Sequence, residues 1–328
     1  MVRVLMLGAG EAGERHGRAL RGLADRCTLT GVYDHDPAAA RATAQALGIP
    51  VADELEPALE TAEAAVVAGA LERRPTLMRT ALERGLDVLV EPPLATTPDL
   101  AHGLLSAIVR SPRRPVAMTA FDEHFDPTVR ELRVLVAEQD VIAVHAERMD
   151  PAVAGPIPPG DVVQDLMQQD LQFVLALSGE TIAATQAAGR RTRRGGPVDH
   201  AHALLVMEDD LVATLVASRA SGTRVRRITV TTQQARVCAD LDTRTIEAVR
   251  TTVSDAGRHE AFTHRIEVPP REAVVVQAEA FLQCVQRRTA PQVGIGAAIA
   301  CQEAALAILK RIELVAHRPA ARRGPQAA

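Results

Sequence analysis

The feature that most constrains the fold is the segment GAGEAG at residues 8–13, which directly follows the apolar run VRVLML. Its three glycines suit a tight turn, a close approach of the backbone to a pyrophosphate, and close packing of a helix on a strand. The helix that begins at Glu11 would face an anion with its N-terminus. We therefore predict a dinucleotide-binding βαβ unit whose phosphate contacts come from Gly8, Gly10, Glu11, Ala12 and Gly13.

A dinucleotide-binding unit of this kind carries an acidic residue at the end of its second strand. Asp34 ends the second apolar run, TLTGVY, and can accept hydrogen bonds from an adenosine ribose while repelling a 2′-phosphate. The next two runs, EAAVV and LDVLV, lead into Ala68, Gly69, Glu91 and Pro92, which we expect to complete the cofactor site. A glycine turn without a ligand is the alternative, but it leaves the register of strand, helix and acid unexplained. The predicted cofactor is NAD rather than NADP.

The chain is predicted to change its architecture after about residue 120. Up to that point strand and helix patterns alternate at short spacing, which indicates a parallel sheet with right-handed crossovers. A strand pattern at 141–150 precedes a helix, and between residues 201 and 268 several strand patterns follow one another through turns, as is typical of an open antiparallel sheet. Helices are expected at 161–178, 271–288 and 296–315. The predicted fold class is α/β, with an N-terminal Rossmann domain at residues 1–120, a C-terminal α+β domain with an open, mostly antiparallel sheet at residues 121–316, and a disordered tail at residues 317–328.

The composition limits the partners and the compartment. A formal net charge of −4 gives no reason to expect nucleic acid or an anionic membrane as a partner. The four cysteines lie far apart, without metal or redox spacing, as expected in a reducing compartment. No stretch approaches the ~20 apolar residues that span a bilayer, and the first apolar run is too short for a signal peptide. We expect a cytoplasmic protein whose partner is a small-molecule substrate.

With these pieces placed, the chain resembles the glucose–fructose oxidoreductase / inositol dehydrogenase family (Gfo/Idh/MocA) over nearly its whole length. The resemblance rests on GAGEAGERH, with His16 after the fingerprint, and on GVYDHDPAAA, ALERGLDVLVEPPLA, AFDEHFDPTVRELR, GDVVQDLMQQDLQFVLALSG, LVATLVASRA and QAEAFLQCVQRRTAP. The loop ERMDPAVAGPIPPGDVVQDL is similar to the branch that oxidises nucleotide-linked amino sugars at C3. The resemblance implies a second domain whose open sheet covers the active site and often forms the oligomer contact. We therefore expect a homodimer or homotetramer.

The chain departs from the family pattern at the positions that move protons. The family's Glu-Lys-Pro segment carries a lysine that helps the substrate hydroxyl proton to leave, and here that position is Pro92, which has no titratable group. The family's acid/base histidine is Gln169 here, and an amide exchanges no proton at neutral pH. Arg74 replaces the histidine of the family's Thr-Pro-x-x-x-His segment. The only lysine, Lys310, and the only tyrosine, Tyr33, lie on segments that we do not expect to reach the active site.

Two segments of the chain contain candidates for the proton transfer that Pro92 and Gln169 cannot carry out. His124 follows the strand that ends the first domain and is the best-placed titratable group for acid/base work, although a surface histidine is the alternative. Asp165 and Gln169 share one face of the 161–178 helix with Gln168 and Gln172. We expect catalytic roles for Asp165 and Gln169 and substrate contacts for the other two glutamines. A solvated helix face would show the same pattern.

Two arginines are candidates for binding an anionic part of the substrate. Arg148 and Arg219 end strands of the second sheet and are expected to clamp a phosphate or carboxylate, unless each belongs to a structural ion pair. The run GRRTRRGG at residues 189–196 is expected to be a solvated loop, with a smaller role in guiding an anionic substrate. His200 and His202 alternate on a strand but have no third ligand at useful spacing, so no metal site is predicted.

These observations predict an NAD(P)-dependent oxidoreductase of the Gfo/Idh/MocA type with a non-standard proton donor or acceptor. Its substrate would be a small polar metabolite, sugar-derived or anionic. Two alternatives remain open because the usual proton-transfer groups are missing. One is a non-catalytic NAD-binding regulatory or partner protein. The other is an enzyme with the same fold that catalyses a non-redox cyclisation, isomerisation or elimination.

Overall fold

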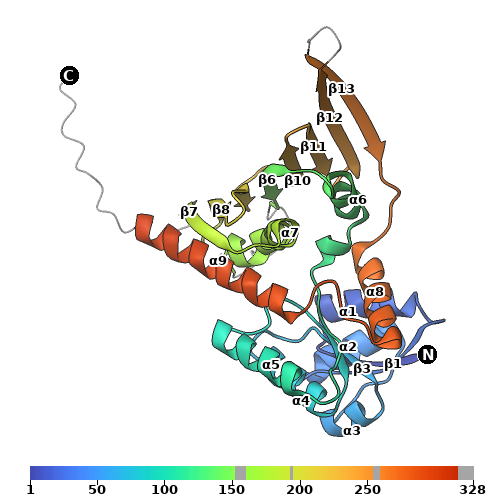
Figure 1. Cartoon of the computed structure of the whole chain (residues 1–328). Helices are drawn as coiled ribbons and strands as arrows, with labels where there is room; N and C mark the ends of the chain where they lie inside the picture. Colours follow the sequence, from blue (N-terminus) through green and yellow to red (C-terminus); the bar gives the residue numbers. More distant parts are fainter. Residues whose placement is uncertain (152–159, 193–194, 254–258, 317–328) are drawn as a thin grey trace. The chain divides into compact units, whose positions relative to one another are not determined.

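The computed structural model describes residues 1–151, 160–192, 195–253 and 259–316 (Figure 1). The predicted disordered tail at 317–328 and part of the predicted arginine-rich loop at 189–196 lie outside these residues. The chain forms two compact units. Unit 1 consists of Met1–Val134 and Val268–Gln302, and unit 2 of Leu135–Glu267 and Glu303–Ala328.

Unit 1 contains a five-stranded parallel sheet in the order β2-β1-β3-β4-β5, which confirms the predicted Rossmann-type architecture. Its strands are β1 (Val2–Leu7), β2 (Cys27–Tyr33), β3 (Ala64–Val67), β4 (Asp87–Val90) and β5 (Ala117–Thr119). The connecting helices are α1 (Glu11–Arg21), α2 (Pro37–Leu47), α3 (Leu55–Glu60), α4 (Arg74–Glu83) and α5 (Pro98–Arg110). The strand order reverses between β1 and β3, and in open parallel sheets ligands bind at the carboxyl ends of the strands beside such a point.

Local sequence explains the elements that frame this point. β3 and β4 are buried along their whole length, as expected for central strands of a parallel sheet covered on both faces. Helix α2 begins where the Asp36 side chain accepts a hydrogen bond from the Ala38 N–H, with Pro37 in the first turn. It ends at Gly48 in the left-handed conformation. The short helix α3, between β2 and β3, was not predicted.

The chain returns to unit 1 after the second sheet, whereas the sequence-based division assigned all of residues 121–316 to the second domain. The Asp87 carboxylate at the start of β4 is buried and pairs with Arg288 at 2.5 Å. The Thr119 N–H at the end of β5 donates to the Val293 carbonyl at 2.9 Å. Helix α8 (Ala273–Arg287) therefore belongs with the parallel sheet, together with the start of α9 (Ile295–Ala316).

Unit 2 contains an eight-stranded sheet in the order β13-β12-β11-β10-β6-β9-β8-β7. Among the described strands β6 pairs with β9 in parallel and the other neighbours are antiparallel, which confirms the predicted open, mostly antiparallel sheet. The strands are β6 (Val141–Met149), β7 (Ile182–Arg190), β8 (His200–Met207), β9 (Val212–Ser218), β10 (Val225–Thr232), β11 (Ala235–Asp240), β12 (Thr245–Val253) and β13 (His259–Glu267). The edge strand β7 was not predicted, because its alanine-rich sequence has weak strand propensity.

The remaining helical segments lie before and after β6 in the sequence. A 3₁₀ turn, η1 (Asp122–Phe125), follows β5 and leads into α6 (Pro127–Val136). The single helix predicted at 161–178 is instead a π-helical turn, η2 (Val163–Met167), followed by α7 (Gln168–Ser178). A π turn has a wider hydrogen-bond ring than an α turn and therefore changes which side chains share a face. Of the helices in the described ranges, none is both long and apolar enough to cross a membrane.

Candidate functional site

The glycine loop after β1 is built for a close approach of the backbone. Gly8 has a φ of +117°, and a Cβ there would lie 2.1 Å from the Gly69 nitrogen in the loop after β3. A Cβ on Gly13 would lie 2.2 Å from the Gly8 carbonyl oxygen. Gly10 differs, since its φ is +88° but no heavy atom of the described chain comes within 4 Å of its Cβ position. The loop is thus packed tightly at its two ends and open at its middle glycine. Helix α1 begins there with Glu11 and Ala12. A phosphate would fit at this helix N-terminus.

The carboxylate of Asp34 is fixed beside this loop. Its Oδ2 accepts a hydrogen bond from the Ala9 N–H at 2.7 Å, and its Oδ1 accepts one from the Asp36 N–H at 2.9 Å. The Gly10 N–H donates to the Thr43 hydroxyl at 3.2 Å. Because each carboxylate oxygen can accept more than one hydrogen bond, Asp34 can still accept from ribose hydroxyls. The residues around the loop therefore fit a dinucleotide.

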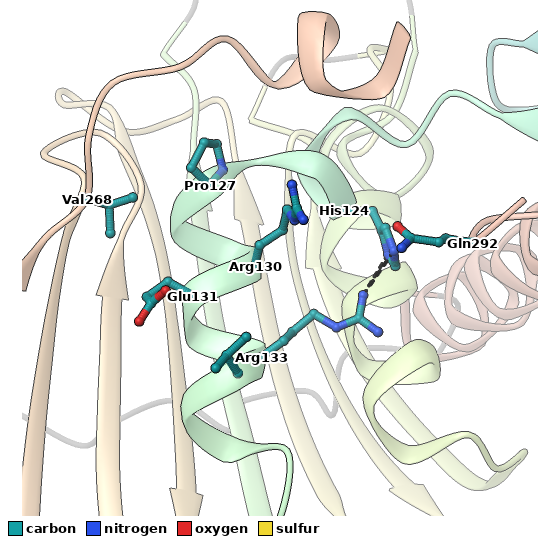
Figure 2. A pocket seen from close by; sticks show the side chains of 8 residues that line it. His124, Pro127, Arg130, Glu131, Arg133, Val268 and Gln292 are labelled. Atoms are coloured by element: carbon teal, nitrogen blue, oxygen red, sulfur yellow. Dashed lines mark hydrogen bonds between the residues drawn. The ribbon is translucent and has the colours of Figure 1, made fainter. Parts of the chain in front are cut away.

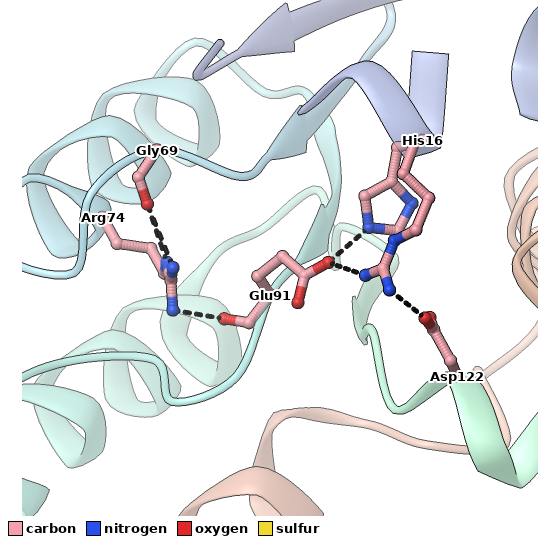
Figure 3. A network of polar contacts seen from close by, with 6 residues as sticks. His16, Gly69, Arg74, Glu91 and Asp122 are labelled. Atoms are coloured by element: carbon pink, nitrogen blue, oxygen red, sulfur yellow. Dashed lines mark hydrogen bonds and ion pairs between the residues drawn. The ribbon is translucent and has the colours of Figure 1, made fainter. Parts of the chain in front are cut away.

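A network of charged side chains connects the loops after β4 and β5 to helix α1 (Figure 3). Glu91 follows β4, and its Oε1 accepts hydrogen bonds from His16 Nε2 at 2.6 Å and from an Arg15 nitrogen at 2.8 Å. A second Arg15 nitrogen lies 2.8 Å from the Asp122 Oδ2, on η1. One guanidinium therefore serves two carboxylates that come from neighbouring strand ends.

The two carboxylates of this network have opposite pKa directions. Burial alone would raise the pKa of Glu91, but the hydrogen bond from His16 and the charges of His16, Arg15 and Arg74 together lower it below its usual range. Burial raises the pKa of Asp122, and the negative charge of Glu91 adds to this rise against the opposing effect of Arg15. Asp122 Oδ1 is buried and has no hydrogen-bond partner in the described part of the chain.

Arg74 holds the segment that contains Pro92. Its guanidinium donates to the carbonyl of Gly69 at 3.0 Å and to that of Glu91 at 3.1 Å (Figure 3). It also donates to the carbonyl of Pro93 at 2.6 Å. Burial lowers the pKa of Arg74, against the charges of Glu91 and Glu72. The arginine thus ties the loop after β3, which begins at Ala68, to the loop after β4. Pro92 itself is joined to Pro93 by a cis peptide bond.

His124 is buried, so the alternative of a surface histidine is wrong. An Arg133 nitrogen lies 2.8 Å from its Nδ1 and 3.1 Å from its Nε2, so a ring nitrogen accepts a hydrogen bond from the guanidinium. The side chain lines a hollow of about 630 Å³ in unit 1 (Figure 2). The other lining residues are Pro127, Arg130, Glu131, Arg133, Val134, Val268 and Gln292. The catalytic role of His124 stays a prediction.

In unit 2 both predicted anion-binding arginines are paired with carboxylates. Arg148 makes two hydrogen bonds to Asp170, of 3.0 and 2.7 Å, and both side chains are buried. Arg219 donates to the Gly160 carbonyl at 2.7 Å and pairs with Asp165 at 2.5 Å. The structure therefore brings together two of the predicted site residues, Asp165 and Arg219, as partners of each other.

The glutamines of α7 are not on a solvated helix face, so that alternative is wrong. Gln168 and Gln172 are each only 4% exposed. The Gln168 Nε2 and the Gln169 Oε1 are buried atoms for which the described residues provide no hydrogen-bond partner. Asp165, one π turn earlier, is exposed instead. The helix therefore presents one buried amide donor and one buried amide acceptor that are ready for a ligand.

The histidine pair of β8 has no metal-type surroundings. His200 and His202 contact each other through their Nε2 atoms at 3.0 Å. Burial lowers the pKa of His202, and the nearby His200 and His145 lower it further. A search of the described residues finds no group of three or more His, Cys, Asp or Glu side chains that could hold a metal ion.

Asp122 was not among the predicted site residues, and neither was Arg15, which lies between Asp122 and Glu91. A signal was present, because Asp122 closely follows β5, and polar residues after parallel strands gather at one edge of the sheet. The motif that contained it, AFDEHFDP, drew attention to His124 instead.

Residues 2–118 match the family described as "Oxidoreductase family, NAD-binding Rossmann fold" (GFO_IDH_MocA). An inositol 2-dehydrogenase from Acidothermus cellulolyticus is 28% identical over 229 residues, which is 66% of this chain and 66% of that protein. A second one, from Rhizobium meliloti, is 28% identical over 57% of this chain and 58% of its own length.

Solved structures share the fold over the whole chain. UDP-N-acetylglucosamine 3-dehydrogenase GnnA from Acidithiobacillus ferrooxidans has a TM-score of 0.88 at 22% identity, covering 97% of this chain and 99% of that one. Levoglucosan dehydrogenase, solved in complex with NADH and levoglucosan, has a TM-score of 0.82 at 13% identity, covering 95% and 97%. At these identities the likeness establishes a common fold.

Proposed function

The chain belongs to the Gfo/Idh/MocA oxidoreductase family, and we propose that it is an NAD-dependent oxidoreductase acting on a hydroxyl group of a small, polar, sugar-like molecule. The observation that carries this proposal is the glycine loop. Gly10 is open to a ligand, while its neighbours Gly8 and Gly13 are packed against backbone. A glycine at this open position lets the backbone approach a pyrophosphate.

The cofactor would be held by the carboxyl ends of the strands. The N–H groups at the start of α1 would bind the phosphates, and Asp34 would accept hydrogen bonds from the adenosine ribose. The nicotinamide supplies the hydride acceptor or donor. NAD is favoured over NADP because the Asp34 carboxylate, fixed by Ala9 and Asp36, cannot turn away from a 2′-phosphate without breaking two hydrogen bonds.

The substrate class is supported by the chemistry of α7. A free amide N–H on Gln168 and a free amide oxygen on Gln169 complement a hydroxyl group, which both accepts and donates hydrogen bonds. By contrast, Arg148 and Arg219 already have carboxylate partners. A neutral polyol or sugar is thus a better match for these residues than a substrate gripped by an arginine clamp. The named relatives act on inositol, levoglucosan and UDP-N-acetylglucosamine.

We further propose that the protein works in the cytoplasm as a homodimer or homotetramer. The four cysteines are free thiols, which is compatible with a reducing compartment. On the sheet of unit 2, the exposed apolar side chains of Leu204 and Val212 lie on neighbouring strands and are suited to a partner surface.

The test is a binding measurement followed by a turnover measurement. Calorimetry with NADH and NADPH should give binding of NADH and much weaker binding of NADPH. A panel of inositols, anhydrosugars and nucleotide sugars is then screened for a stoichiometric change in NADH absorbance. Absence of nucleotide binding would overturn the proposal.

A second function, a non-catalytic NAD-binding protein, is favoured by one observation. Pro92 and Gln169 occupy the positions where the family places its proton-transfer groups. Tight NADH binding without turnover of any member of the panel, together with recovery of one partner protein by the NADH-bound form, would select this function over the first.

A further inference from the structure

Asp122 lies where a proton-transfer group of a nicotinamide enzyme is needed. It opens η1 three residues after the end of β5 at Thr119, and Glu91 directly follows the neighbouring β4, whose last residue Val90 pairs with Thr119. A dinucleotide spans the point where the strand order reverses, with one mononucleotide on each half of the sheet. Asp34 after β2 marks the adenosine half, so the ends of β4 and β5 belong to the nicotinamide half.

The two oxygens of Asp122 have different surroundings. Oδ2 lies 2.8 Å from Arg15, whereas the buried Oδ1 has no partner among residues 1–151, 160–192, 195–253 and 259–316. A buried carboxylate oxygen without a hydrogen bond is costly, and protonation of that oxygen removes the charge. An acid O–H at Oδ1 would be a donor that has no acceptor among the residues that the structure describes. Such a group is suited to a ligand oxygen.

The charged groups near Asp122 do not offset the rise in its pKa that burial causes. Arg15 and His16 on α1 favour the ionised form, while Glu91 and Glu123 oppose it. Arg15 divides its hydrogen bonds between Asp122 and Glu91, so it neutralises only part of the pair. Helix α8, which packs against η1, carries the buried amide of Gln277, which is neutral. Burial, together with the charges of Glu91 and Glu123, therefore raises the pKa of Asp122 above its ordinary value.

Other groups in unit 1 are less suitable. The Glu91 Oε1 already accepts from His16 and Arg15, and its pKa is lowered, which makes it a weak base. A ring nitrogen of His124 is occupied by the Arg133 guanidinium. Pro92 has no proton to exchange.

We propose that Asp122 exchanges the proton of the substrate hydroxyl, in place of the lysine that the family would carry at the position of Pro92. In the oxidative direction the O–H bond of the alcohol breaks and its proton passes to the Asp122 carboxylate, as the C–H hydrogen leaves as hydride to NAD⁺ and a C=O bond forms. In the reductive direction the Asp122 acid returns the proton to the new alkoxide oxygen. The inference rests on the proposed function and assigns its missing acid/base.

The experiment compares NAD⁺ with NADH and requires no substrate. The nicotinamide ring is positively charged in NAD⁺ and neutral in NADH, so only NAD⁺ should favour the ionised form of a carboxyl group beside the ring. Binding is measured by calorimetry, and proton release is followed with a pH indicator in weakly buffered solution. The pH is kept above the ordinary Asp pKa of about 3.9. We expect release of up to one proton per bound NAD⁺ and none on binding of NADH. Asp122→Asn should abolish the release, and the exposed control Asp25→Asn should keep it.

Each outcome is decisive. Failure of both nucleotides to bind would remove the proposed function and this inference with it. Equal proton release with the two nucleotides, or a difference that survives in Asp122→Asn, would overturn the inference and leave the proposed function standing. If Asp122→Asn does not fold, infrared difference spectra of the unmodified protein replace it. NAD⁺ should then convert a carboxylic-acid band into a carboxylate band, and an unchanged carboxyl region would overturn the inference.

A turnover measurement adds a second readout once a substrate is known. Asp122→Asn should lower kcat by about 100-fold or more, in the range of general acid/base catalysis, and should flatten the pH profile of kcat/KM. A purely structural role would lower activity without changing the pH profile.

Discussion

The two halves of the carboxyl edge of the parallel sheet in unit 1 differ in what fixes their geometry. On the side of β1 and β2, the geometry depends on backbone: Gly8, Gly10 and Gly13 set the loop, and Asp34 is positioned by two main-chain N–H groups. On the side of β4 and β5, it depends on side chains, since Arg15 and Arg74 connect carboxylates and carbonyls from three loops.

This difference has a consequence for how each half can change. A loop held by backbone contacts tolerates almost no substitution at Gly8 and Gly13, because a Cβ at either position meets main-chain atoms. A network of side chains can exchange members while its architecture persists. The glycine fingerprint predicted from the sequence is held by such backbone contacts, whereas the loops after β4 and β5 are held by side chains. Substitutions made in one half at a time test whether the two halves differ in their tolerance of substitution.

The largest effect is expected on the backbone-fixed side. Gly8→Val would place a Cβ 2.1 Å from the Gly69 nitrogen at a φ of +117°, which costs about 3 kcal/mol of unfolding free energy and should abolish NADH binding. Gly103→Ala is the matched control, because its Cβ would meet nothing within 4 Å inside α5, and it should stabilise by about 0.5–1 kcal/mol. Chemical denaturation and NADH titration measure both. Wild-type binding by Gly8→Val would contradict a backbone-fixed loop.

A smaller loss is expected on the side-chain-fixed half. Arg74→Met removes the donors to the carbonyls of Gly69, Glu91 and Pro93 and should cost about 2 kcal/mol, since the freed carbonyls are partly buried. Arg79→Met on the exposed face of the same helix is the control and should change stability by less than about 0.5 kcal/mol. Urea denaturation compares the two variants. Equal stabilities would show that the loop after β4 does not depend on this arginine.

Cofactor preference tests the adenosine side alone. Asp34→Ser removes the negative charge while leaving a short polar side chain, and the ratio of NADH to NADPH affinity should fall about tenfold or more, equivalent to about 1.4 kcal/mol. Asp36→Ser, two residues away, alters the N-cap of α2 and should leave the ratio unchanged. Calorimetric dissociation constants for the four protein–nucleotide pairs decide the outcome. An unchanged ratio in Asp34→Ser would mean that the ribose lies elsewhere.

The same contrast explains how far the sequence could be interpreted. The glycine loop and the strands of the parallel sheet were predictable because each depends on a short stretch of local sequence. The bridge between Glu91 and Asp122 was not predictable, because it requires Arg15, which is 76 positions from Glu91 in the chain, and the burial of both acids. The π turn at Val163–Met167 was likewise hidden, since an α pattern and a π pattern differ by one residue in spacing.

The smallest effect separates the two carboxylates of the side-chain-fixed half by the sign of their pH dependence. The pKa of Glu91 is lowered, so its ionisation stabilises the fold above the ordinary Glu pKa of about 4.3, and this stability is lost as the pH falls through the lowered value. The pKa of Asp122 is raised, so its stabilising contribution is complete below the ordinary Asp pKa of about 3.9 and is lost as the pH rises through the raised value. Glu91→Gln should therefore be less stable than wild type at neutral pH, with the gap closing in acid. Asp122→Asn, which resembles the protonated acid, should be as stable as wild type in acid and more stable than wild type at neutral pH.

Denaturation curves recorded across this pH range measure both differences in stability. If the two differences changed with pH in the same direction, the shared Arg15 would not distinguish the two acids.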